Sequence, residues 1–141
     1  MTKYVLNIPP KPQPSPRFNG KGQLVETKEI ADWKKAVGRM LRARQPKIIN
    51  NGSIFIAMTF YLYPPQTISK KDSRRALSNL ELERIFVEKK PCSDDLTESF
   101  LNAACGILYK NNEQIAVLST QKLYSLNPRI EITIEKLEVE K

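Results

Sequence analysis

Hydrophobic and polar positions along the chain divide it into predicted strands and helices separated by polar or proline-rich segments. Residues 4–8 predict a short first strand. Residues 27–44 predict an amphipathic helix because apolar side chains recur there at steps of three and four residues. These side chains are Ile30, Trp33, Val37 and Met40 or Leu41. We expect the indole of Trp33 to pack in the core rather than to stack on a nucleobase.

A long irregular segment separates these two elements. Five prolines between positions 9 and 16 disfavour helix and remove backbone donors. Residues 9–25 therefore predict an extended, basic, proline-rich loop with a turn near Asn19, Gly20 and Gly22. An irregular segment of this length inside a small domain is more often functional than idle. A linear proline motif for a partner protein is a weaker interpretation of the same residues.

The middle of the chain predicts a buried strand and two helices. Residues 53–63 form an almost continuous apolar and aromatic run, which indicates a central strand covered on both faces. Residues 69–77 predict a short capped helix with exposed cations. A further helix begins near Asp94 or Asp95, and its expected buried stripe is Leu96, Phe100, Ala103 or Ala104, and Ile107.

Two strands are expected to complete the fold, at about residues 114–124 and 129–139. In the second strand isoleucines alternate with glutamates and a threonine, which is typical of a half-solvated strand. The element order predicts one α/β (α+β) domain spanning residues 1–141, with a mixed β-sheet flanked by helices. A length of 141 residues suits one compact core.

Composition narrows the class of protein further. No window approaches the roughly 18 consecutive apolar residues of a membrane span, and the first residues do not resemble a signal peptide. We therefore expect a cytoplasmic protein. The chain has no histidine and only two cysteines, thirteen positions apart. This excludes mechanisms that need an imidazole, and it argues against a zinc site or a disulfide framework.

The positive charge lies in the first part of the chain. Residues 1–60 contain 11 lysines and arginines against three acidic residues, whereas residues 61–141 contain 12 of each kind. All of the net charge of +8 therefore belongs to the first 60 residues. Such asymmetry is typical of a protein with a polyanionic partner, although simple solubility would explain it equally well.

The acidic residues that could carry chemistry gather in and after the second long helix. Asp94, Asp95 and Glu98 are spaced to share one helix face, and Glu113 follows the helix. Such carboxylates could hold Mg²⁺, whose bound water could attack a phosphodiester. The alternative is that Asp95 and Glu98 form a capping arrangement in an acid-rich first turn. From the spacing alone, capping is the better interpretation.

Residues 89–115 resemble the signature of the RusA family of Holliday-junction resolvases. In that family a Lys-Pro-Asp-x-Asp-Asn-Leu run opens a helix, a lysine follows four residues after the second aspartate, and the helix ends in Gly-x-Leu-Tyr-Lys before Asp-Asp-x-Gln-Ile. This chain matches the pattern without a gap. Its Pro-Arg-Phe after the prolines and its Phe-Tyr-Leu-Tyr-Pro-Pro run also resemble family segments. The resemblance implies a homodimer that binds four-way DNA junctions, with Mg²⁺-dependent cleavage in active members.

The chain departs from the family at the catalytic positions. Cys92 stands where the first aspartate is expected, Asp94 matches the second, and Asp95 replaces the asparagine. Glu98 replaces the catalytic lysine, and Asn111 and Asn112 replace the Asp-Asp pair. Asparagine does not offset metal charge, and a thiol is a poor Mg²⁺ ligand. Catalysis is therefore expected to be impaired, unless Asp94 and Glu98 hold the metal, helped by Asp95 and Glu113.

Three hypotheses of function follow. The first is a junction-binding protein of DNA recombination and repair with weak or absent nuclease activity. The second is an active Mg²⁺-dependent resolvase with rearranged carboxylates, and the third is a non-enzymatic protein-interaction module on the same fold. A bacterial or phage origin suits all three. The residues expected to contact DNA are Arg17, Lys21, Lys70, Lys71, Arg74, Arg75, Lys89 and Lys90.

Overall fold

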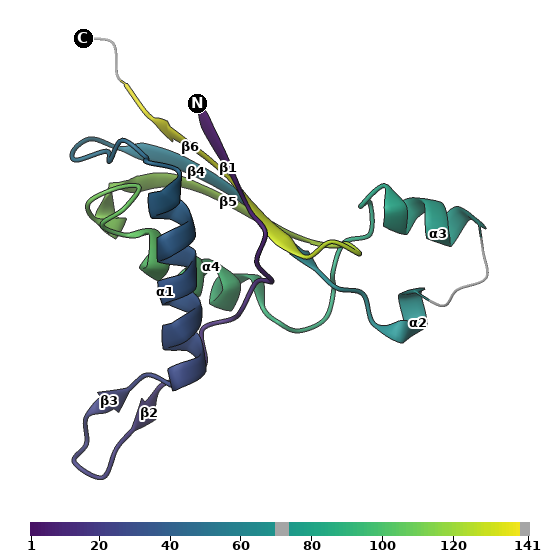
Figure 1. The fold of residues 1–141 in the computed structure, drawn as a ribbon, viewed down its shortest axis with the longest axis horizontal. Coiled ribbons are helices and arrows are strands. Elements are labelled where there is room, and N and C mark those ends of the chain that lie inside the picture. Colours follow the sequence, from purple (N-terminus) through teal and green to yellow (C-terminus); the bar gives the residue numbers. More distant parts are fainter. Residues whose placement is uncertain (70–73, 139–141) are drawn as a thin grey trace.

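The computed structural model describes residues 1–69 and 74–138, which form a four-stranded sheet with helices packed on it (Figure 1). The sheet consists of β1 (Thr2–Leu6), β4 (Ile54–Leu62), β5 (Ile115–Tyr124) and β6 (Arg129–Lys136). The helices are α1 (Lys28–Ala43), α2 (Gln66–Ser69), α3 (Arg74–Glu81), α4 (Ser93–Ala104) and a 3-10 helix, η1 (Asn112–Gln114). Strands β2 (Arg17–Phe18) and β3 (Leu24–Val25) form a separate hairpin. In the described residues, no helix has both the length and the apolar character to cross a membrane.

The sheet is mixed, with the strand order β1-β6-β4-β5. Strands β4 and β5 are parallel, and the other two neighbouring pairs are antiparallel. A parallel pair needs a crossover connection, and the crossover from β4 to β5 contains α2, α3, α4 and η1. The predicted α+β fold with a mixed sheet is therefore confirmed.

The main hydrophobic core lies between one face of the sheet and helices α1 and α4. Alternate residues of β4 and β6 point into it, namely Ile54, Ile56, Met58, Phe60, Ile130, Ile132 and Ile134. The helices contribute Ile30, Trp33, Val37, Leu41, Leu96, Phe100, Ala103 and Ala104. Each large side chain buried in this way stabilises the fold by about 1.5–3 kcal/mol. The predicted stripe of α1 is confirmed, and Trp33, only 9% exposed, is a core residue.

The prediction that residues 53–63 are covered on both faces is wrong. Strand β4 is internal in the sheet, but its second face, with Phe55, Ala57, Thr59 and Tyr61, is only partly buried in the described structure. The reason is that α1 and α4 pack on the same side of the sheet (Figure 1). A strand between two neighbours can be strongly apolar even when one of its faces meets few other elements.

Three element boundaries also differ from expectation. The predicted helix at 69–77 falls across the end of α2 and the start of α3, with residues 70–73 outside the described part of the chain. Helix α4 ends at Ala104, so Ile107 packs on the core from the following turn, where Gly106 has φ of +87°. The predicted loop at 9–25 ends in the β2–β3 hairpin.

Arg129 joins the second face of the sheet to the loop after α3. Its guanidinium donates to both carboxylate oxygens of Glu83 at 2.6 and 2.8 Å, and its Nε donates to Glu131 Oε2 at 3.0 Å. Its Nη2 forms an ion pair with the same Glu131 oxygen at 2.9 Å. It also lies 3.8 Å from the centre of the Tyr61 ring. The hydrogen bonds from Arg129 lower the pKa of Glu83. Burial acts to raise the pKa of Glu131, but bonds from Lys3 and Arg129 lower it overall.

Replacing Arg129 by methionine should reduce the free energy of unfolding by about 1–3 kcal/mol at neutral pH, because charge-assisted hydrogen bonds to two carboxylates are lost. Since the folded-state pKa values of Glu83 and Glu131 are depressed, this stabilisation is present above the ordinary carboxyl pKa of 4.5. It is lost as the pH falls through the folded-state pKa values. Urea unfolding of the wild type and the variant at several pH values between about 7 and about 3 measures the difference in their free energies of unfolding.

The matched control is Arg39→Met, since Arg39 is exposed on α1 and makes one long hydrogen bond to the Lys35 carbonyl oxygen (3.4 Å). It should leave stability nearly unchanged. An Arg129→Met protein as stable as the wild type at neutral pH, or a difference that grows in acid, would contradict the account of this network.

Candidate functional site

The first turn of α4 carries the acidic residues singled out in the sequence. Cys92 occupies the N-cap position without a side-chain cap hydrogen bond, and Asp94 and Asp95 lie in the first turn, where acids suit the helix dipole. The Asp94 carboxylate accepts a hydrogen bond from the Asp95 backbone N–H at 3.0 Å. The interpretation that Asp95 and Glu98 form a capping arrangement is wrong, because the helix already begins at Ser93.

A hollow of about 560 Å³ lies between α4, η1 and the edge strand β5. Asp94 and Glu98 line it from α4, Asn112 from η1, and Leu118 and Thr120 from β5. The structure thus brings together the two carboxylates predicted to bind metal and one of the two asparagines. We call this hollow, together with Cys92 at the N-cap of α4 beside Asp94, the α4 site.

Of the other predicted acids, Asp95 and Glu113 do not line this hollow, whereas Glu98 lines both it and a second one. Asp95 and Glu98 line a second hollow of about 530 Å³, on the side of α4 that faces the proline-rich segment and the β2–β3 hairpin. Cys92, Asp94 and Asp95 each place one possible ligand atom within 4.8 Å of the other two. Glu113 lines neither hollow and is exposed on η1.

The two asparagines have different structural roles. Asn111 caps η1, since its side-chain oxygen accepts a hydrogen bond from the Glu113 N–H at 3.0 Å. Asn112 turns toward the α4 site. The hydroxyl of the buried Tyr109 lies 2.7 Å from Asn112 Oδ1 and 2.8 Å from the Leu101 carbonyl oxygen, so these two acceptors share its single hydrogen. Burial raises the pKa of Tyr109, so its hydroxyl stays protonated at neutral pH. Tyr109 therefore holds Asn112 in place.

Two sets of hydrogen bonds position α4, and the sequence did not reveal them. Lys122 in β5 donates from Nζ to the carbonyl oxygens of Lys89 and Pro91, at 2.9 and 2.8 Å. On the other side of the helix, the Ser99 hydroxyl donates to the Lys11 carbonyl oxygen at 2.5 Å, and the Gln13 N–H donates to the Asp95 carbonyl oxygen at 2.9 Å. A lysine near the end of a predicted strand is only a weak signal in the sequence. Hydrogen bonds between backbone atoms give no signal in the sequence at all.

The basic residues predicted to contact DNA fall in three places. Arg17 and Lys21 are exposed on the β2–β3 hairpin, and Lys89 and Lys90 are exposed just before α4. Arg74 and Arg75 open α3, and Lys70 and Lys71 lie outside the described residues. The hairpin and the α2–α3 segment project from opposite sides of the molecule, with α4 between them (Figure 1).

The donors at the α4 site fit magnesium poorly. Mg²⁺ prefers a near-octahedral set of oxygen ligands and is usually held by carboxylates. Asp94 and Glu98 provide such groups, but the oxygen of Asn112 is neutral and already lies beside the Tyr109 hydroxyl. Cys92 offers sulfur, which magnesium binds weakly. We therefore derive no metal-dependent step from these residues.

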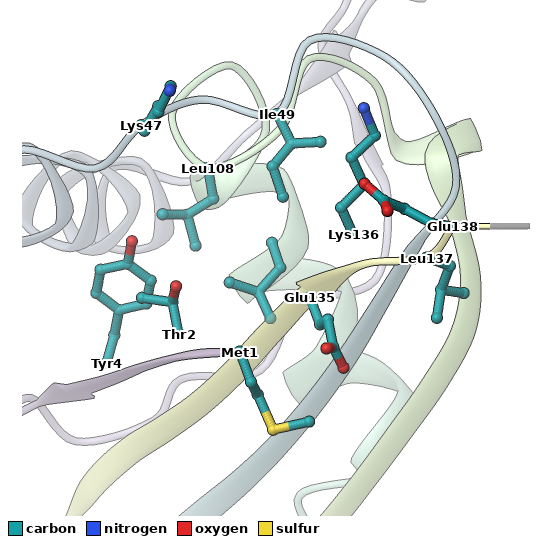
Figure 2. Close-up of a pocket in the computed structure, with 11 residues that line it drawn as sticks. Met1, Thr2, Tyr4, Lys47, Ile49, Leu108, Glu135, Lys136, Leu137 and Glu138 are labelled. Carbon is teal, nitrogen blue, oxygen red and sulfur yellow. The ribbon is translucent and has the colours of Figure 1, made fainter.

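A further hollow of about 580 Å³ lies beside the start of β1 and the end of β6 (Figure 2). Side chains of both charges line it, among them Lys47, Glu135, Lys136 and Glu138. None of the residues predicted for catalysis or DNA contact lines this hollow. It therefore adds nothing to the α4 site.

Comparison with known proteins places the whole arrangement in one family. A family model described as endodeoxyribonuclease RusA matches residues 7–135. The chain is also 25% identical over 138 residues to the uncharacterized protein YqaN of Bacillus subtilis (strain 168), with 96% of each chain covered. The family match takes in the proline-rich segment, both long helices and the α4 site. The chain therefore belongs to the RusA endodeoxyribonuclease family.

Proposed function

We propose that this protein binds branched DNA, specifically four-way junctions, and cleaves it weakly or not at all. The observation that carries the proposal is the donor set of the α4 site, where Asp94 keeps the family position while Cys92 and Asn112 replace expected aspartates. Membership of the RusA family supports branched DNA as the ligand. A protein of this kind would act in recombination and repair in the cytoplasm of a bacterium, on host or phage DNA.

The changed residues weaken catalysis for two physical reasons. Fewer carboxylates at the site reduce the attraction for a divalent cation, which would supply a nucleophilic water and polarise the phosphate if it were bound. The replacement of a lysine by Glu98 also removes a positive charge and adds a negative one beside the incoming phosphodiester. Binding is affected less, since the basic residues that contact phosphate lie elsewhere.

The positions of the basic residues along the fold suit contact with more than one arm of a junction. Arg17 and Lys21 project on the hairpin, Lys89 and Lys90 precede α4, and Arg74 and Arg75 open α3 on the opposite side of the molecule. Lys70 and Lys71 belong to the same proposal, although they lie outside the described residues. Cations on both sides of one central helix suit a branched polyanion better than a single straight duplex.

An active resolvase with rearranged carboxylates is the second candidate function. The observation in its favour is that Asp94 and Glu98 line the same hollow, so that two carboxylates could converge there on one Mg²⁺ ion. The two candidates differ in one measurable property, which is metal-dependent cleavage of a junction.

We expect the purified protein to bind a labelled four-way junction without nicking it when Mg²⁺ or Mn²⁺ is present. The binding constant should fall steeply with salt, and the slope should decrease by about one for each of Arg17→Gln and Lys21→Gln, because each removes one phosphate contact. Gel shift and denaturing gels measure both properties. Symmetric nicks that disappear in Asp94→Asn would instead establish the active alternative.

Restoring the family residues should restore cleavage. The triple variant Cys92→Asp, Glu98→Lys, Asn112→Asp returns two carboxylates and a cation to the α4 site. We expect it to nick junctions in the presence of Mg²⁺ at a rate at least about tenfold above that of the wild type, because positioned charges stabilise the transition state. Asn7→Asp is the matched control, since it makes the same amide-to-carboxylate change at an exposed position that does not line the hollow. Equal cleavage by the triple variant and the wild type would show that other features suppress the activity.

The homodimer implied by the family also belongs to this proposal, and the edge of β5 is the surface that suits it. Residues 115–121 carry no charge, and Val117 and Leu118 are 44% and 46% exposed. On the side away from β4, residues 116–121 make no described backbone hydrogen bond, and such bonds begin at Lys122. An uncharged, open edge is one that proteins usually protect or pair. We therefore propose that a second copy pairs with this edge, next to the α4 site.

Val117→Lys should convert the dimer to a monomer, because a charge on an edge strand opposes strand pairing. The change can be followed by sedimentation at several protein concentrations. Leu126→Lys is the control, since Leu126 is 52% exposed in the turn after β5. A wild-type protein that sediments as a monomer throughout, or a dimer that Val117→Lys leaves intact, would exclude pairing through this edge.

A further inference from the structure

A groove of about 610 Å³ lies beside the segment that leads into α4, and of its lining residues the proposed function uses only Lys89 and Lys90. Its lining is mostly apolar and consists largely of prolines and two tyrosines, with Lys89 and Lys90 at one wall. None of its lining residues is acidic. We call it the Tyr63 groove, after the side chain that distinguishes it.

Tyr63 is an aromatic residue that the fold does not need. It follows β4 and is 64% exposed, whereas Tyr124 in the same groove is 6% exposed and belongs to a small core cluster with Leu80 and Val87. An exposed tyrosine ring flanked by prolines offers a flat apolar face without loss of core packing. Flat faces of this kind stack on nucleobases, and the stacking depends little on base sequence.

The walls of the groove are fixed before any ligand arrives. The Lys122 ammonium holds the carbonyl oxygens of Lys89 and Pro91, and the Trp33 indole N–H donates to the carbonyl oxygen of Pro9 at 2.9 Å. The backbone next to Tyr63 is held by the Ser125 N–H, which donates to the Leu62 carbonyl oxygen at 2.9 Å. A preformed groove loses little conformational entropy when a ligand binds.

Charge favours a nucleotide over a peptide as the occupant. A proline-rich peptide would also suit an apolar groove with aromatic residues, but its backbone offers no anion to Lys89 and Lys90, which are both exposed. A nucleotide combines a flat base with a phosphate. That combination matches an exposed ring beside two lysines.

We propose that the Tyr63 groove binds one unpaired nucleotide of branched DNA, with the base stacked on Tyr63 and a neighbouring phosphate at Lys89 and Lys90. Pro91 in the groove wall and Asp94 in the α4 site are three residues apart along the chain. Their Cα atoms can therefore be separated by at most about 10 Å. A base held in the groove would therefore direct the adjoining phosphate toward α4. This inference rests on the proposed function, and it gives a reason for branch selectivity, because unpaired bases are the easiest to unstack.

The test compares three DNA probes by fluorescence anisotropy: a four-way junction, the same junction with abasic sites at the crossover, and oligothymidylate. Tyr63→Ala should weaken binding to the intact junction and to oligothymidylate by roughly five- to 150-fold. The slope of affinity against salt should not change, since phosphate contacts are retained. Abasic sites should weaken the wild type by a similar factor and leave Tyr63→Ala unaffected.

Phe86→Ala is the matched control, because Phe86 is 66% exposed and lies outside the groove. It should bind all three probes as the wild type does. Tyr63→Ala with wild-type affinity for the junction would overturn the inference while leaving the proposed function intact. If abasic sites weaken the binding of the wild type and of Tyr63→Ala by the same factor, the inference is likewise overturned and the proposed function is unaffected.

The remaining outcomes separate the inference from the function on which it rests. Binding to oligothymidylate that depends on Tyr63, without any binding to junctions, would refute the proposed function and support the groove as a nucleotide site. A wild type that binds none of the probes would refute both. A proline-rich peptide that binds only when Tyr63 is present, with oligothymidylate unaffected by the variant, would assign the groove to a peptide and overturn the inference.

Discussion

The proline-rich segment between β1 and the β2–β3 hairpin is held against both long helices, and the site depends on that contact. Prolines have no backbone N–H, so this segment presents mainly carbonyl oxygens, and side chains of the helices donate to them. Trp33 of α1 donates to Pro9, and Ser99 of α4 donates to Lys11. In the opposite direction, the Gln13 N–H of the segment donates a hydrogen bond to the Asp95 carbonyl oxygen of α4. Together these bonds fix the first turns of α4 against α1, so that the acidic turn and the wall of the Tyr63 groove have defined positions.

The family's chemistry and the family's fold depend on different residues in this chain, which explains how one can change while the other remains. Cys92, Glu98, Asn111 and Asn112 are all exposed, so substitution at these positions removes no core packing. Tyr109, in contrast, is fully buried and hydrogen-bonded to the backbone of α4. Residues of such a surface site can therefore change while the domain keeps its core packing and its stability.

Local pattern predicted most of the fold, because periodicity records which side of an element is buried. The stripe of α1 and the alternation in β6 were correct for this reason. The open face of β4 was not predicted, since it depends on both helices choosing the same side of the sheet. The start of α4 lies at Ser93, one residue before the predicted position, because Cys92, which is not a preferred N-cap residue, occupies the N-cap. In the site, helical spacing predicted that Asp94 and Glu98 share a face, but only the crossover connection places Asn112 beside them.

The strand order has a consequence for how the molecule folds. Every neighbouring pair in the sheet joins strands that are distant in sequence, since β1 pairs with β6, β6 with β4, and β4 with β5 across the long crossover. Long loops must therefore close before any ladder of the sheet can form, and chains of this kind fold more slowly than those built from hairpins. The α4 site lies on the crossover itself. One wall of this site is β5, whose only neighbour in the described sheet is β4, so that wall takes its place in the sheet only after the crossover has closed.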